Sequence, residues 1–208
     1  MRLFLTLALL LAPLAAHAQS LRLEAGLGGD VAVIFGDLSD EAEAVTGVDD
    51  FAGAGVGGAG NLAVWFDTPS GFSVGVQGFA DHAGLDIEID HNDIDGDRDS
   101  YGALALFAYR RPTGPHHPYV GGGIGYAWTD ASYEQFDRGD LEIDLRGDDG
   151  SVAGSFFGGY DYDLNPHAYV GVRATARFDG GTIVSRLGGS ADYTQITTGF
   201  TGQVGVRF

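Results

Sequence analysis

Apolar and polar residues alternate with a period of two over several long stretches of this chain. In the last stretch, residues 191–208, one face carries Phe200, Gly202, Val204, Val206 and Phe208, and the other carries Gly199, Thr201, Gln203, Gly205 and Arg207. Because successive side chains of a strand point to opposite faces, this pattern predicts a strand with one apolar and one polar face. Such a strand, ending the chain on an aromatic residue, is typical of a bacterial outer-membrane barrel, in which lipid meets one face and the lumen the other.

Alternation of this kind predicts eight strands: residues 21–35, 53–66, a third starting at Phe72, 100–110, 118–129, 151–163, 167–178 and 191–208. The connections between them alternate between long and short, and the short ones contain Pro or Asn. Outer-membrane barrels show the same asymmetry, with short periplasmic turns and long external loops. We therefore predict an all-β fold, an eight-stranded antiparallel transmembrane up-and-down β-barrel. A soluble β-sandwich is the alternative, although sandwiches lack this alternation and the terminal aromatic residue.

The predicted inward faces carry charged and amide side chains that form a candidate polar network in the lumen. Its members are Arg22, Glu24, Asp161, Asp163, Arg173, Arg177, Gln195, Gln203 and Arg207. Opposite charges in a narrow lumen are expected to pair, because an unpaired buried charge is costly. One interpretation is a polar plug that holds the barrel rigid, and the other is a gated pore for small solutes. Eight strands favour the plug, since open porins have about 16 strands or more.

Three segments are less clear in their pattern. In residues 100–110, Leu104 and Leu106 favour one outward face, whereas Tyr101, Phe107 and Tyr109 favour the other. We prefer the aromatic face outward, which places Arg110 inward. Residues 85–90 and 141–145 also alternate, and they are predicted to continue the barrel wall beyond the membrane.

The N-terminal residues 1–18 are predicted to be a secretory signal peptide. Arg2 precedes the apolar stretch Leu3–Leu14, and Ala16-His17-Ala18 is a small-x-small cleavage pattern, so the mature barrel domain is expected to span 19–208. A membrane-spanning helix is the alternative, but the apolar run is short for one. The chain contains no cysteine, which excludes disulfides and thiolate metal sites.

The formal net charge is −18, and all 11 basic residues are arginine. Nucleic-acid binding is not expected, because it depends on neutralising phosphates with positive charge. The acidic residues gather mainly in residues 37–50, 81–99 and 130–149, between the apolar stretches, as expected for external loops. Among them, Asp93, Asp95, Asp97 and Asp99 form a candidate divalent-cation site, with Ca²⁺ as the matching ion. A solvated acidic loop is the alternative. Any bound cation is expected to be shared with anionic lipopolysaccharide.

An enzymatic role receives little support from the residues. His82 and His91 lie near the predicted external side, with Ser100 and Ser132 as nearby serines, but no local motif positions a nucleophile. We therefore expect a protein that is not an enzyme and has no catalytic or cofactor-binding residues. A lipid-modifying enzyme is kept as an alternative.

Several motifs resemble a known family. The segment Pro118-Tyr119-Val120-Gly121-Gly122-Gly123-Ile124-Gly125-Tyr126, the preceding Tyr109-Arg110, the segment Tyr169–Arg173 and the ending Val206-Arg207-Phe208 resemble the small porin-like outer-membrane barrels related to OmpA and the opacity proteins. The resemblance covers residues 20–208. It implies that Phe208 is an assembly signal read by the barrel-insertion machinery. We expect no periplasmic peptidoglycan-binding domain in this chain, so anchoring to the cell wall is not implied.

We therefore expect a cell-surface protein of the outer membrane of a Gram-negative bacterium. Its expected role is structural and adhesin-like, through acidic external loops. The expected partners are outer-membrane lipid, lipopolysaccharide, the insertion machinery and a host or cell-surface ligand, and the barrel is expected to be a monomer. A narrow pore for small solutes or ions is the alternative function.

Overall fold

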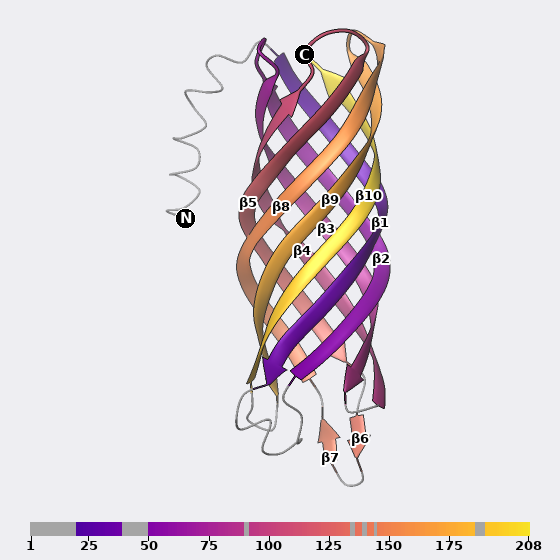
Figure 1. Ribbon diagram of the computed structural model, residues 1–208, viewed down its shortest axis with the longest axis vertical. Coiled ribbons are helices and arrows are strands. Elements are labelled where there is room, and N and C mark those ends of the chain that lie inside the picture. Colours follow the sequence, from indigo (N-terminus) through magenta and orange to yellow (C-terminus); the bar gives the residue numbers. More distant parts are fainter. Residues whose placement is uncertain are drawn as a thin grey trace.

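The computed structural model describes residues 20–38, 50–89, 92–133, 136–138, 141–143, 145–185 and 190–208. Eight antiparallel strands form a closed barrel (Figure 1): β1 (Ser20–Leu38), β2 (Asp50–Asp67), β3 (Phe72–Ile89), β4 (Asn92–Arg110), β5 (His116–Tyr133), β8 (Leu145–Asn165), β9 (Ala168–Ser185) and β10 (Ser190–Arg207). Each strand pairs with its neighbours in sequence, and β1 closes the barrel against β10. The predicted fold is confirmed. The predicted signal peptide lies outside the described residues.

Most strands are longer than predicted, because the alternation of side chains continues beyond the point where the polar and apolar faces exchange. The fourth strand, predicted over 100–110, begins at Asn92, and β3 extends to Ile89. The segment 85–90 thus continues the wall as far as Ile89, as predicted. The prediction for 141–145 is wrong in part: β7 (Leu141–Ile143) pairs with β6 (Phe136–Arg138) in a separate two-stranded sheet. The two strands of a short hairpin pair their backbone N–H and C=O groups with each other, so these residues can pair outside the barrel wall.

The short turns and the C-terminus lie at one end of the barrel, here called the turn end, and β6 and β7 lie beyond the opposite loop end (Figure 1). The β2–β3 turn closes with Gly71, whose φ of 91° suits glycine, and its N–H donates to the Thr68 carbonyl at 3.0 Å. Phe208 and Leu21 exchange backbone hydrogen bonds of 2.9 and 3.2 Å. Among the described residues, no helix is both long and apolar enough to cross a membrane.

The outer face of the barrel carries an apolar belt between two groups of aromatic residues. Near the loop end, Tyr101 stacks on Trp128 with ring centroids 5.9 Å apart, and near the turn end Phe72 meets Tyr109 at 5.3 Å. Tyr101 and Tyr109 are separated by about 26 Å of strand, which at a tilt of about 40° gives a height of about 20 Å, close to the apolar band of outer-membrane barrels. Leu104 and Leu106 are buried, so the aromatic face of the fourth strand points outward as preferred.

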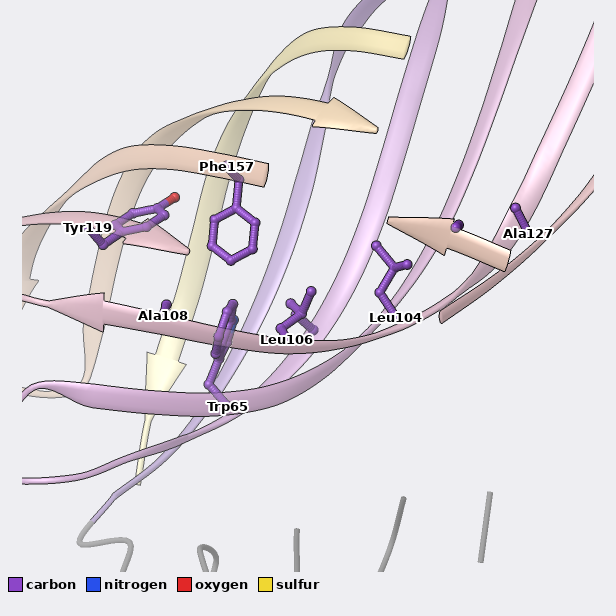
Figure 2. Packing of buried hydrophobic residues seen from close by; sticks show 9 residues of the cluster. Trp65, Leu104, Leu106, Ala108, Tyr119, Ala127 and Phe157 are labelled. Carbon is purple, nitrogen blue, oxygen red and sulfur yellow. The ribbon is translucent and has the colours of Figure 1, made fainter. Parts of the chain in front are cut away.

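Inside the barrel, one side of the lumen is packed as an apolar core (Figure 2). Its buried residues are Ala63, Trp65, Leu104, Leu106, Ala108, Tyr119, Ala127, Ala153 and Phe157. Trp65 on β2 and Phe157 on β8 face each other across the lumen, with ring centroids 6.0 Å apart. The lumen of this barrel is therefore filled by side chains, as expected for eight strands.

Candidate functional site in the barrel lumen

A group of six charged residues, here called the turn-end cluster, fills the lumen near the turn end. It consists of Arg22, Glu24, Asp67, Arg110, Asp161 and Arg173. Arg22 pairs with Glu24 at 2.9 Å and with Asp67 at 3.1 Å, and Arg110 pairs with Asp161 at 2.8 Å. Arg173 also pairs with Glu24. Three arginines meet three carboxylates, so the cluster is balanced in charge.

Aromatic side chains of the apolar core hold these arginines in place. The Arg173 guanidinium lies 5.0 Å from the Phe157 ring centroid, and Arg22 lies 5.0 Å from that of Trp65. The Tyr169 hydroxyl donates to Glu24 at 2.9 Å, and the Tyr119 hydroxyl shares a hydrogen bond of 2.8 Å with Gln203. Ring faces attract cations, so the aromatic core also stabilises the charge network.

At the turn-end mouth of the barrel, the Asp163 carboxylate accepts hydrogen bonds from Arg207 and His117. Arg207 lies 2.7 Å from its carboxylate, and His117 Nε2 lies 2.8 Å from it. His117 Nδ1 is 2.7 Å from the Arg111 carbonyl oxygen, which ties the β4–β5 turn to the mouth. These contacts lie beside the turn-end cluster, since Arg207 and Arg110 both lie over the ring of Tyr169.

A second group, here called the loop-end cluster, lies further along the lumen. It consists of Asp30, Asp81, Arg98, Arg177 and Asp179. Arg177 pairs with Asp81 at 2.7 Å and with Asp179 at 3.3 Å, and Arg98 also pairs with Asp81. Arg98 donates to Thr197 at 3.2 Å, and Gln195 donates to the same hydroxyl at 3.1 Å.

The predicted network thus falls into three groups. Arg22, Glu24, Asp161 and Arg173 belong to the turn-end cluster with Gln203 beside it, Asp163 and Arg207 lie at the mouth, and Arg177 and Gln195 lie at the loop-end cluster. Arg98 is absent from the predicted network because it lies within the acidic run 93–99. The period of two nevertheless identifies it, because Arg98 lies between the exposed residues Asp97 and Asp99 and therefore on the opposite face of the strand.

The acidic run itself lies on β4. Asp97 and Asp99 are exposed on the outer face, while the side chains of Asp93 and Asp95 lie outside what the structure describes. The Asp99 carboxylate lies 2.9 Å from Nδ1 of His82. Within the described residues, no group of three or more His, Asp or Glu side chains could hold a metal ion. Calcium binding at this run therefore stays a prediction.

The histidine and serine considered for catalysis lie on opposite faces of the wall. His82 is exposed on the outer face, whereas Ser100 is buried in the lumen and lies 3.2 Å from the Thr129 hydroxyl. Ser100 therefore cannot serve His82 as a nucleophile. His91 lies outside the described residues, as does the side chain of Ser132.

Comparisons with known proteins agree with this fold. A family model described as outer membrane protein beta-barrel domain matches residues 4–208. Neisserial surface protein A is a similar solved structure, with 14% identity, coverage of 88% of this chain and 97% of that one, and a TM-score of 0.44. Ail of Yersinia pestis has 14% identity, coverage of 90% and 98%, and a TM-score of 0.45.

The outer membrane protease OmpT of Escherichia coli has 9% identity, coverage of 92% and 97%, and a TM-score of 0.50. At this identity the likeness to OmpT shows the fold alone. A comparison with curated proteins gave no match.

Proposed function

The chain belongs to the outer membrane protein β-barrel domain family and lies in the outer membrane, and from this premise we propose that it is a non-conducting surface protein that binds basic partners through its acidic loop end. The barrel body supports the membrane and contacts outer-membrane lipid and lipopolysaccharide through its apolar belt. The partner is a host or cell-surface ligand with positive charge.

The observation that carries this proposal concerns the loop end of β3, β4 and β5, where the outward side chains change from apolar to charged. Beyond the aromatic group of Tyr101 and Trp128, the exposed outward side chains that the structure describes on these strands are those of His82, Asp86, Asp97, Asp99 and Asp130. At the same end, next to the charged side chains of the loop-end cluster, the lumen contains apolar side chains that are at most 2% exposed: Ala32, Ile34, Ala83 and Leu85. Exposed charged side chains outside buried apolar ones are the arrangement of a water-soluble protein, so this part of β3, β4 and β5 is suited to water outside the membrane.

The ion-paired lumen supports a plug rather than a pore. Arg98 and Asp161 are both completely buried, and the turn-end and loop-end clusters fill the lumen in succession. We expect purified protein in planar lipid bilayers to give no discrete conductance steps. Regular steps in the wild-type protein, lost or altered in Arg173→Met, would instead support a gated pore.

A lipid-modifying or proteolytic activity has weaker support. The buried position of Ser100 removes one candidate nucleophile for His82, and similarity to OmpT at 9% identity supports a common fold and no common reaction. We expect co-expression with the wild-type protein to leave the acyl chains of lipid A unchanged. Loss of acyl chains that depends on His82 would support the enzyme.

The binding proposal is tested with protein in zwitterionic liposomes, which carry no net charge of their own. We expect a fluorescent decalysine peptide to bind wild-type proteoliposomes at low salt and to dissociate as salt screens the charges. The variant with Asp86, Asp97, Asp99 and Asp130 each changed to Asn is expected to lose most of this binding. Thr198→Asn, a neutral change at an exposed outward residue, is the matched control. Equal binding by all three proteins would contradict the proposal.

A further inference from the structure

A cavity of about 60 Å³ lies in the middle of the lumen. It is bounded by Gln77 and Phe157, which contact Arg173 of the turn-end cluster, and by Asp81 and Arg177 of the loop-end cluster. A water molecule needs about 10–15 Å³ of such volume, so the cavity has room for a small ion with a few waters.

Asp30 lines this cavity without a hydrogen-bonding partner. Its side chain is 2% exposed, yet neither carboxylate oxygen accepts a hydrogen bond from any other described residue. Its register partners are Gly57 on β2 and Gly199 on β10, and neither glycine has a side chain that could donate. The nearest cation is Arg98, whose Nη2 lies 4.0 Å away and is held by Asp81.

Two further oxygens that line the cavity are buried and unpaired among the described residues: Oδ1 of Asn61 and Oγ1 of Thr201. Thr201 pairs in register with Gly28, the inward position immediately before Asp30 on β1. Buried polar groups are normally satisfied by protein or by an ordered ligand or water, so several unpaired oxygens around one cavity point to an occupant.

The charges around the cavity determine what that occupant is. The loop-end cluster has three carboxylates, Asp30, Asp81 and Asp179, but only two arginines, Arg98 and Arg177. With all five groups ionised, one negative charge is left over, and we assign it to Asp30, the carboxylate that no other described residue hydrogen-bonds. The available donors are carboxylate, amide and hydroxyl oxygens, which suit hard cations.

We propose that the mid-lumen cavity binds a hydrated monovalent alkali cation, anchored by the Asp30 carboxylate with Thr201 and Asn61 as further oxygen donors, directly or through water. A single positive charge balances the cluster, whereas a divalent ion would leave it with an excess positive charge. The site lies inside the barrel and does not involve the acidic outer face. The test of this proposal is therefore independent of the test of the proposed function.

The first experiment measures unfolding by urea in lipid vesicles while NaCl replaces choline chloride at constant ionic strength. A ligand that binds only the folded state raises its stability with concentration, so we expect the wild-type midpoint to rise with Na⁺. Asp30→Asn, which keeps the shape of the side chain and removes its charge, is expected to lose this shift. Asp99→Asn, on the exposed outer face, is the matched control and is expected to keep it. An equal shift in all three proteins, or none in the wild type, would overturn the proposal.

The second experiment locates the ion and does not depend on the variant folding. Wild-type crystals soaked in thallium(I) acetate are expected to show an anomalous peak in the cavity beside Asp30. The same peak is expected to be absent from Asp30→Asn crystals, where these can be grown. A wild-type cavity with ordered waters and no anomalous peak would show that water alone satisfies Asp30, and the proposal would be wrong.

Discussion

At the scale of single residues, the choice of arginine over lysine matches what the lumen needs. Arg22, Arg98, Arg110, Arg173 and Arg177 are all buried, and the chain contains no lysine. The guanidinium group stays charged, forms two-pronged contacts with carboxylates and stacks on aromatic rings, whereas a lysine ammonium is more strongly hydrated. The buried arginines of this barrel use all three properties, since they pair with Asp and Glu and lie over Trp65, Tyr119, Phe157 and Tyr169.

The first prediction concerns Glu24, which links Arg22 and Arg173. In Glu24→Gln the turn-end cluster keeps three arginines but only two carboxylates, so a buried positive charge is left uncompensated. Removing one partner of a buried ion pair costs about 3–5 kcal/mol. We expect a loss of that size in the free energy of unfolding, measured by urea titration in lipid vesicles.

Asp99→Asn is the control for this prediction. It removes the charge from an exposed pair and is expected to cost about 0–1 kcal/mol. Similar losses in both variants would contradict the assigned network.

The second prediction concerns the lipid-facing side chain of Val172, which is 60% exposed. An arginine at the bilayer midplane of a barrel costs about 2–4 kcal/mol, and near the interface about 0–1 kcal/mol. We expect Val172→Arg to show the larger loss in urea unfolding. Gly84→Arg is the control, because this outward position lies beyond the apolar belt and a side chain there meets open space. Normal stability of Val172→Arg in lipid would show that the register of β9 is wrong.

At the scale of strands, the sequence predicts faces well where one face is apolar and the other polar. β1, β9 and β10 fit this rule, and their inward residues were assigned from alternation alone. β2 and β4 do not fit it, because Trp65, Leu104 and Leu106 point inward opposite an outward face that is also apolar. A lumen this narrow is packed like a protein core, so its lining includes large apolar side chains and the contrast between the faces disappears.

Strand ends were predicted less well for a related reason. The polarity of the pattern reverses where the wall leaves the membrane, and a segment such as 92–99 then looks like an acidic loop although it is part of β4. The period of two is unchanged across the reversal, and it is the period that identifies the strand. The pairing of individual charges, and the orphaned Asp30, depend on which strands meet across the lumen and could not be obtained from alternation.

The third prediction tests how closely two strands approach each other. A Cβ at Gly125 on β5 would collide with the backbone of Ala103 and Leu104 on β4, whereas a Cβ at Gly154 on β8 would meet nothing within 4 Å. We expect Gly125→Ala to lose about 1–3 kcal/mol, as overpacked sites do. Gly154→Ala, a matched change, is expected to stay within about 0.5 kcal/mol. The folded fraction on heat-modifiability gels and urea unfolding in vesicles report both. Equal behaviour of the two variants would mean that β4 and β5 are further apart than described.

At the scale of the whole molecule, charge is placed in two different environments. Inside, arginines and carboxylates form paired clusters held by aromatic rings, and outside, carboxylates stand exposed at the loop end. Most of the formal net charge of −18 therefore comes from residues outside the two lumen clusters, because the turn-end cluster is balanced and the loop-end cluster has one excess negative charge. This arrangement supports the proposed surface role over the alternative of a pore.

Assembly of the whole barrel leads to the last prediction, on Phe208. The backbone of this residue bonds to Leu21 across the β1–β10 closure, and its side chain is 71% exposed. Phe208→Ala keeps the backbone bonds and removes only the aromatic ring, while deletion of Phe208 removes both. If the insertion machinery reads the ring, both variants reach the outer membrane at reduced levels, measured by fractionation and heat-modifiability gels.

Purified Phe208→Ala is nevertheless expected to refold into vesicles as well as the wild type, because the closure is intact. Undiminished outer-membrane levels of both variants would contradict a recognition role, and poor refolding of Phe208→Ala would show that the ring acts in barrel closure instead.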